Sequence, residues 1–185
     1  TVQDNRIKKL YELGKQLNWN VEVDVDWTPK FKSISDEEFD FENTQWDKHE
    51  TFKTFDRQTR LEFFKDLNSW ATSQFLHGEQ GALLVASQLA SCAPTYTAKL
   101  YAASQTFDEA RHVEAFNKYL QQRLKRSWPI GRALKGLLDK ILTDPRWDLK
   151  FIGMQVVIEG LALAAFNAAK EGTNDPVYKL SLIHI

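Results

Sequence analysis

The segment Phe107–Phe116, FDEARHVEAF, places ionisable side chains inside a stretch that otherwise has the apolar spacing of a helix. Glu109 and His112 are three residues apart, so on a helix both project from one face and can reach a single metal ion. A pair at this spacing also arises by chance, as a surface pair or a satisfied core pair. The segment therefore raises the question of further ligands elsewhere in the chain.

Two other acids, Glu79 and Glu159, each lie in the middle of a long apolar helical pattern. A buried carboxylate is costly unless a cation or a hydrogen-bond donor satisfies it. Glu79 and Glu109 each lie about 14 to 15 residues from the turn near Pro94, which is roughly 22 Å of helix. Counted from Pro145, Glu159 reaches the same height after about 14 residues. Independent acids are not expected to share one level of a helical bundle.

Glu79, Glu109, His112 and Glu159 are therefore the predicted ligands of one metal site. Mixed carboxylate and imidazole ligation suits iron or manganese, though not uniquely. The alternative is a buried network of glutamate, histidine and arginine without metal, which Arg111 could support.

Helical periodicity dominates the part of the chain that must position these residues, and strand signal is nearly absent. The chain is predicted to be all-α, with long antiparallel helices that form a bundle. We expect an irregular N-terminal arm over residues 1–54, on the outside of the core, and a helical bundle over 55–185. The arm contains one short helix, an extended stretch and an acidic, turn-rich stretch, over residues 5–17, 20–27 and 33–47. The bundle helices are expected over residues 55–93, 94–126, 132–142, 145–171 and from 176 onward.

Capping residues mark several helix ends. Thr54 is the expected cap of the first bundle helix, and the second is expected to start at Pro94. The remaining signals are Asp144 with Pro145, Gly172 as a stop, and Asp175 with Pro176.

Composition places the chain among globular proteins, with 43% hydrophobic residues and a net charge of −1. This balance gives no sign of nucleic-acid binding. The single cysteine, Cys92, cannot form an intrachain disulfide, which favours a reducing, cytoplasmic location. No apolar run was expected to reach the roughly 20 residues that span a bilayer, so no membrane partner is predicted.

The segments FLHGEQGALLVASQL, SQTFDEARHVEAFNKYL and GMQVVIEGLALAAF resemble the ferritin-like di-iron carboxylate proteins of the ribonucleotide-reductase-like type. The likeness covers roughly residues 55–178 and implies a ferritin-like antiparallel four-helix bundle. It implies that Glu79 and Glu159 are lone ligands and that Glu109 and His112 form the first Glu-x-x-His pair. Asp108 and Arg111 would then orient imidazoles and balance charge around the ligands.

The chain departs from this family in two ways. The second Glu-x-x-His is absent, and the helix that begins at Pro176 would reach the metal layer only beyond Ile185. His184 comes too early and is not counted as a ligand. We therefore expect a C-terminally truncated bundle that lacks its last ligand helix, and the origin of residues 180–185 stays open. Phe116 occupies the position where reductase subunits usually carry a radical tyrosine, and Tyr119 lies on another face.

The resemblance implies an oxidoreductase with two irons, or a manganese–iron pair, that uses O2 to oxidise or oxygenate a small organic substrate. The truncated chain is expected to be inactive, to hold at most one metal weakly, and to self-associate through its uncovered face, with a homodimer as one possible assembly. The alternatives are a radical-generating reductase subunit, ferritin-like iron storage and a metal-free helical interaction protein. The residues expected to line a cavity or pack in the core are Phe75, Leu83, Phe116, Ile152 and Leu163.

Overall fold

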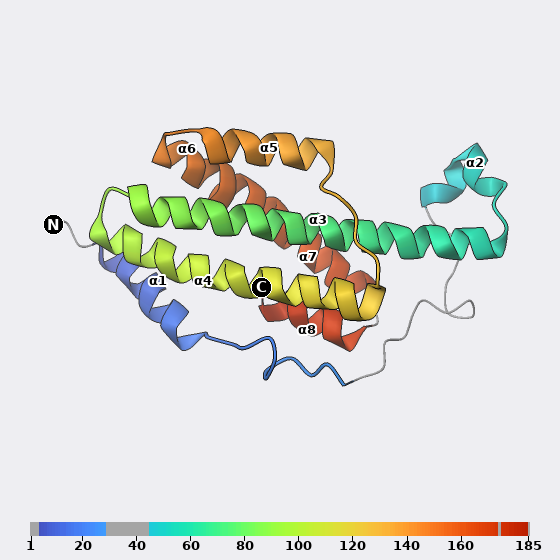
Figure 1. The fold of residues 1–185 in the computed structure, drawn as a ribbon, viewed down its shortest axis with the longest axis horizontal. Coiled ribbons are helices and arrows are strands. Elements are labelled where there is room, and N and C mark those ends of the chain that lie inside the picture. Colours follow the sequence, from blue (N-terminus) through green and yellow to red (C-terminus); the bar gives the residue numbers. More distant parts are fainter. Residues whose placement is uncertain (1–3, 29–44, 174, 185) are drawn as a thin grey trace.

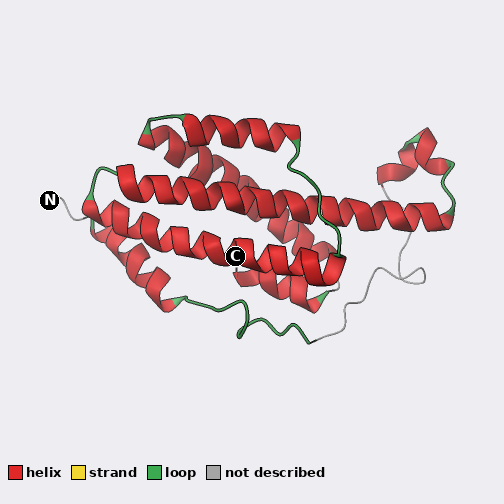
Figure 2. Ribbon diagram, in the orientation of Figure 1, coloured by secondary structure: helices red, strands yellow, loops and turns green. Residues whose placement is uncertain are grey.

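The computed structural model describes residues 4–28, 45–173 and 175–184, and within these ranges all regular secondary structure is helical (Figure 1, Figure 2). This confirms the all-α prediction. The α-helices are α1 (Asn5–Gln16), α2 (Glu50–Lys53), α3 (Arg57–Cys92), α4 (Tyr96–Tyr119), α5 (Arg132–Thr143), α6 (Trp147–Phe151), α7 (Glu159–Gly172) and α8 (Pro176–His184). Three further segments are the 3₁₀ turn η1 (Gln45–Lys48) and the π-helical segments η2 (Leu120–Leu124) and η3 (Ile152–Ile158).

The two long helices α3 and α4 form an antiparallel pair at the centre of the fold (Figure 1). Asp56 caps α3 by accepting a 2.7 Å hydrogen bond from the Thr59 amide, and Thr95 caps α4. Both helices therefore begin two residues later than the predicted starts. Thr54 is not the cap, because its hydroxyl donates to the Thr51 carbonyl at the end of α2.

The C-terminal third folds over this pair. Segments α6, η3 and α7 follow one another without a break and end at Gly172, as predicted. The predicted start at Pro145 is wrong, because the Asp144 carboxylate accepts from the Arg146 amide at 2.9 Å and the helix begins only at Trp147. The predicted cap of α8 is confirmed, since Asp175 accepts from the Val177 amide at 2.9 Å.

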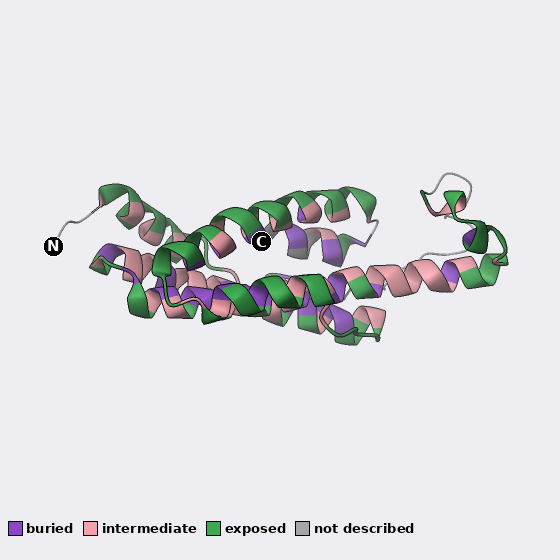
Figure 3. Ribbon diagram, turned by 90° about the horizontal axis from the view of Figure 1, so that it is seen from above, coloured by how far each residue is buried: buried purple, intermediate pink, exposed green. Residues whose placement is uncertain are grey.

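Two apolar clusters fill the interior. One gathers Leu76, Phe116 and Phe166, and the other Val85 and Met154, each with further aliphatic neighbours. Three acids lie between the two clusters. On its own helix, each is preceded by residues of one cluster and followed by residues of the other; the acids are Glu79, Glu109 and Glu159. The candidate site therefore sits at the junction of the two clusters. In Figure 3 the end of α3 beside α2 is mainly half-buried or exposed.

The expected cavity or core residues divide into two groups. Phe116 is fully buried and Phe75 packs against its cluster. Ile152 and Leu163 are about half exposed, at 50% and 55%, so their assignment to a cavity or core is wrong. Both lie on the α6–η3–α7 helix, whose outward face is apolar; its exposed members are Trp147, Leu149, Phe151, Ile152, Val156, Val157, Leu161 and Leu163.

The helix Trp147–Gly172 is long and apolar enough to cross a membrane by length and composition, with 17% of its apolar window buried. The prediction that no apolar run is long enough to span a bilayer is therefore wrong by length and composition. Core helices of soluble proteins pass the same test, so the absence of a membrane partner stays a prediction.

The N-terminal segment lies against the outer side of α4. Helix α1 is confirmed and runs beside α4 (Figure 1). Residues 20–27 form turns rather than an extended stretch, and they bury Val21 and Val25 against the bundle. Most of the acidic stretch over residues 33–47 lies outside the described residues. Part of the predicted arm therefore contributes to the core.

Candidate metal centre

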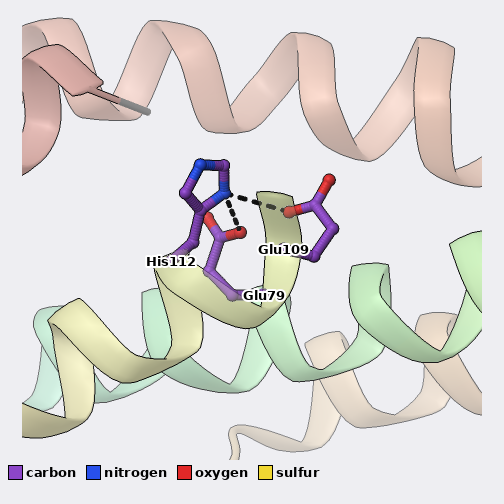
Figure 4. Close-up of side chains that lie close together, drawn as sticks. All are labelled: Glu79, Glu109 and His112. Atoms are coloured by element: carbon purple, nitrogen blue, oxygen red, sulfur yellow. Dashed lines mark hydrogen bonds and ion pairs between the residues drawn. The ribbon is translucent and has the colours of Figure 1, made fainter. Parts of the chain in front are cut away.

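Glu79, Glu109 and His112 meet in the interior between α3 and α4 (Figure 4). Nδ1 of His112 lies 3.2 Å from Oε2 of Glu79 and 3.1 Å from Oε2 of Glu109. The ligand atoms of the three side chains lie within 4.8 Å of one another, and all three residues are buried. The structure therefore brings two carboxylates and one imidazole nitrogen to a single point.

Helix geometry explains this convergence. Glu109 and His112 are three residues apart on α4, and such pairs share a helix face. The short α3–α4 connection makes the helices antiparallel, so residues equally far from it meet. Glu79 and Glu109 indeed lie at one level, as the equal helix distances predicted. Their ligation of a metal stays a prediction.

Glu159 stands apart from the other three. It is the first residue of α7, is half-buried, and lies outside the group whose ligand atoms are within 4.8 Å of one another. It is nevertheless close enough to interact electrostatically with that group. Burial, followed by the charge of Glu109, raises the pKa of Glu159 to about 7, and the charge of His112 opposes this rise.

Glu79 and His112 hold their protons more tightly in the cluster than they would in water. Burial raises the pKa of Glu79 to about 8, against the lowering effect of its hydrogen bond to His112. Burial alone would lower the pKa of His112, but hydrogen bonds to Glu109 and Glu79 prevail and raise it to about 9. Two carboxylates thus compete for the one proton that Nδ1 can carry. A divalent cation at this point would satisfy both, so the donor set fits a metal.

The contacts of Arg111 lie toward Asp108 and the N-terminal segment, and its role in orienting the imidazole stays a prediction. Arg111 pairs with Asp108, and its Nη1 donates to Oδ1 of Asn18 at 2.9 Å and to the Trp19 carbonyl at 3.1 Å. These contacts link α4 to the N-terminal segment. The ring that faces His112 belongs to Trp19, with centroids 6.2 Å apart and an interplanar angle of 21°. Sequence reasoning missed Trp19, because it lies in an irregular stretch without periodicity.

A partly buried amide pair lies one helical turn from the acids. Gln105, four residues before Glu109, donates from Nε2 to Oε1 of Gln155, which is four residues before Glu159. Nε2 of Gln155 is buried and has no hydrogen-bond partner among the described residues. Sequence reasoning missed this pair as well, although the repeated Gln-x-x-x-Glu spacing on two helices was a signal that could have found it.

Nearby, burial raises the pKa of Tyr101, and the charges of Glu109 and Glu159 raise it further. Tyr101 lies one turn before Gln105 on α4, so polar side chains continue along this face of the helix away from the acids.

The other histidines have ordinary roles or lie outside the site. His77 bonds to the Trp128 carbonyl at 2.9 Å and to Gln80 at 3.1 Å, so it serves helix packing away from the cluster. His49 is exposed. The side chain of His184 lies outside the described residues.

Comparison with protein-family models found no match, and searches of curated proteins and of solved structures found none either.

Proposed function

We propose that this chain carries the metal-binding half of a ferritin-like di-iron carboxylate oxidoreductase that uses dioxygen to oxidise or oxygenate a small organic molecule. The observation that carries the proposal is the convergence of Glu79 and Glu109 on Nδ1 of His112 in the interior of an antiparallel helix pair. Supporting it are the all-helical fold and the resemblance of the segments around these residues to that family.

Glu79, Glu109 and His112 would hold the metal, and Glu159 is an acid close enough to interact with them electrostatically. Bound iron, or a manganese–iron pair, supplies redox chemistry with dioxygen that no side chain provides. The chain itself sets the site: the carboxylates bind the cation, and His112 gives up the proton on Nδ1. The apolar clusters on either side exclude water from the metal.

A metal-free interaction protein is the competing function, and one observation favours it. His112 with a raised pKa can satisfy both carboxylates as an imidazolium, without any metal. The two functions differ in what happens when a divalent cation is offered. The metal proposal requires the cation to displace protons from the cluster.

The deciding experiment is titration of the purified protein with Co(II), followed by its visible absorption, with metal content measured after gel filtration. We expect bound metal in the wild type and at least a tenfold loss of affinity in Glu79→Gln, Glu109→Gln and His112→Gln. Glu114→Gln, an exposed acid on α4, and His77→Gln are the matched controls and should bind as the wild type does. Wild-type protein that binds no Co(II), or binds it equally after these substitutions, would refute the metal proposal.

Because a chain without the second Glu-x-x-His is expected to be inactive, dioxygen use is tested separately on a longer version of the protein that carries this pair, loaded with Fe(II) without air. Oxygen uptake should depend on Glu109 and His112 and be unaffected by Glu114→Gln. Metal binding without oxygen uptake would leave a metal site but reject the oxidase.

A further inference from the structure

The stretch Asn18–Trp27, which we name the N-terminal strap, runs along α4 and η2 (Figure 1). Its residue Trp19 lies with its ring nearly parallel to the imidazole of His112, at an angle of 21° and a centroid separation of 6.2 Å. Trp19 is partly buried and packs against the apolar cluster that contains Phe116. Metal binding by the predicted ligands does not in itself require any of these contacts of Trp19.

Three cations spaced along α4 and η2 hold the strap. Arg111 binds Asn18 and the Trp19 carbonyl, and its guanidinium lies 5.3 Å from the centre of the Trp19 ring. Further along the helix, Lys118 pairs with Glu22 at 2.5 Å, and Arg123 donates to the Trp27 carbonyl. Contacts between cations and aromatic faces add to such attachments.

Buried side chains and a hydrogen bond within the strap also anchor it. Val21 and Val25 are 1% and 2% exposed, and Nε1 of Trp27 donates to the Val21 carbonyl at 2.7 Å. A segment fixed at several points can hold one side chain in a defined place. Trp19 is therefore fixed beside His112 by contacts on both sides of it in the chain.

We propose that Trp19 is a positioning residue of the metal centre. Its ring stops the His112 imidazole from rotating about its side-chain bonds, so that Nδ1 stays turned toward Glu79 and Glu109, and it shields one face of the imidazole from water. Arg111 supports Trp19 and acts on the site only through it. The inference rests on the proposed function for its metal part, and it makes the N-terminal strap a component of the site. Groups that orient a ligating histidine typically change metal affinity by about 10- to 100-fold.

The test compares Trp19→Ala with Trp147→Ala, which removes an exposed tryptophan of α6 that lies outside the strap and makes no ring contact with His112 among the described residues. Trp19→Ala should weaken Co(II) binding by about tenfold or more, and Trp19→Phe should restore most of it because a flat ring remains. Trp147→Ala should bind Co(II) within about threefold of the wild type. Equal affinities in wild type and Trp19→Ala, with a folded protein by circular dichroism, would overturn the proposal.

Fluorescence adds a spectroscopic signature. Co(II) bound at the cluster should quench the emission of Trp19, so Trp19→Phe should lose most of the metal-induced quenching and Trp147→Phe should keep it. Quenching that survives Trp19→Phe unchanged would contradict the placement of Trp19 beside the metal.

A metal-free measurement separates this inference from the proposed function. In the NMR spectrum, the ring protons of His112 should carry a ring-current shift that Trp19→Ala removes and Trp147→Ala leaves. If wild-type protein binds no Co(II), the metal proposal fails, and this shift alone decides whether Trp19 positions His112. Absence of the shift in the wild type would overturn the positioning role, whatever the metal data show.

Discussion

The hydroxyl of Tyr119 donates a 2.9 Å hydrogen bond to Oδ2 of Asp175, and both residues are buried. The same carboxylate caps α8 through the Val177 amide. Burial, followed by the negative charge of Asp175, raises the pKa of Tyr119, which therefore remains a hydrogen-bond donor at neutral pH. The pair fastens the end of α4 to the start of α8.

Tyr119→Phe should lower the free energy of unfolding by about 1 to 3 kcal/mol, because it leaves a buried carboxylate oxygen without its donor. Urea denaturation measures this loss. The control is Tyr96→Phe, since Tyr96 is exposed. A Tyr119→Phe variant as stable as wild type would mean that water replaces the hydroxyl.

Metal binding at pH 7 should release protons, because Glu79 and His112 hold protons at this pH that they would largely have lost in water. The pKa of His112 is raised to about 9, and that of Glu79 to about 8. Titration calorimetry in buffers of different ionisation enthalpy reports the number released. The apparent affinity should rise with pH up to about 9. An affinity independent of pH would place the metal elsewhere.

The same shifts set how the stability of the metal-free protein depends on pH. His112 contributes stability that is complete below about 6.5, its unfolded pKa, and is lost as the pH rises through about 9. Glu79 acts in the same direction between about 4.5 and 8, since the folded state holds the proton longer. The melting temperature should therefore fall from pH 6.5 to 9, and this fall should be smaller in His112→Gln.

Gly81 gives a packing prediction with controls in the same chain. A Cβ at Gly81 would lie 2.6 Å from Cδ2 of Leu138, a buried side chain of α5. Gly81→Ala should therefore cost about 1 to 3 kcal/mol of stability, as overpacking does. A Cβ at Gly78 or Gly136 meets nothing within 4 Å, so alanine there should stabilise the helix by about 0.5 to 1 kcal/mol. Thermal unfolding of the three variants compares these effects directly.

The exposed apolar face of α6–η3–α7 should cause self-association in water, since such faces favour burial. Leu161, 66% exposed, and Val156, 57% exposed, lie on it. Leu161→Lys and Val156→Lys should shift sedimentation profiles toward the monomer, while Tyr96→Lys, on a different helix, should not. Wild-type protein that stays monomeric at high concentration would contradict this, and flotation with phospholipid vesicles would then test the membrane alternative.

Much of the helical framework could be predicted, because apolar periodicity and proline and glycine positions act locally. Asp175 and Pro176 mark the start of α8 in the sequence and in the structure. The helix start near Thr54 was misplaced because Thr54 and Asp56 can each cap a helix, and contacts elsewhere decide between them. The start near Pro145 was misplaced because Asp144 bonds to the Arg146 amide and no side chain caps α6. Competing caps of similar strength are not resolved by local sequence.

Within the candidate site, the levels of Glu79 and Glu109 followed from counting residues along regular α-helix. The same count was less reliable for Glu159, because the π-helical segment η3 precedes it and alters the rise and the direction of the residues that follow. Trp19 could not be predicted at all, since its place depends on tertiary contacts of an irregular stretch with Arg111 and His112.

The N-terminal strap also bears on how the protein folds. Glu79 and His112 are 33 residues apart and belong to one helical hairpin, whereas Arg111 and Asn18 are 93 apart. Closing the longer loop costs about 1 kcal/mol more entropy, and distant contacts slow folding. The Glu79 carboxylate and the His112 imidazole should therefore meet early, in a helical-hairpin intermediate. In this intermediate the strap has not yet docked, so Trp19 does not cover His112. Docking of the strap would then be a late step, visible as a slow change in Trp19 fluorescence after the helices have formed.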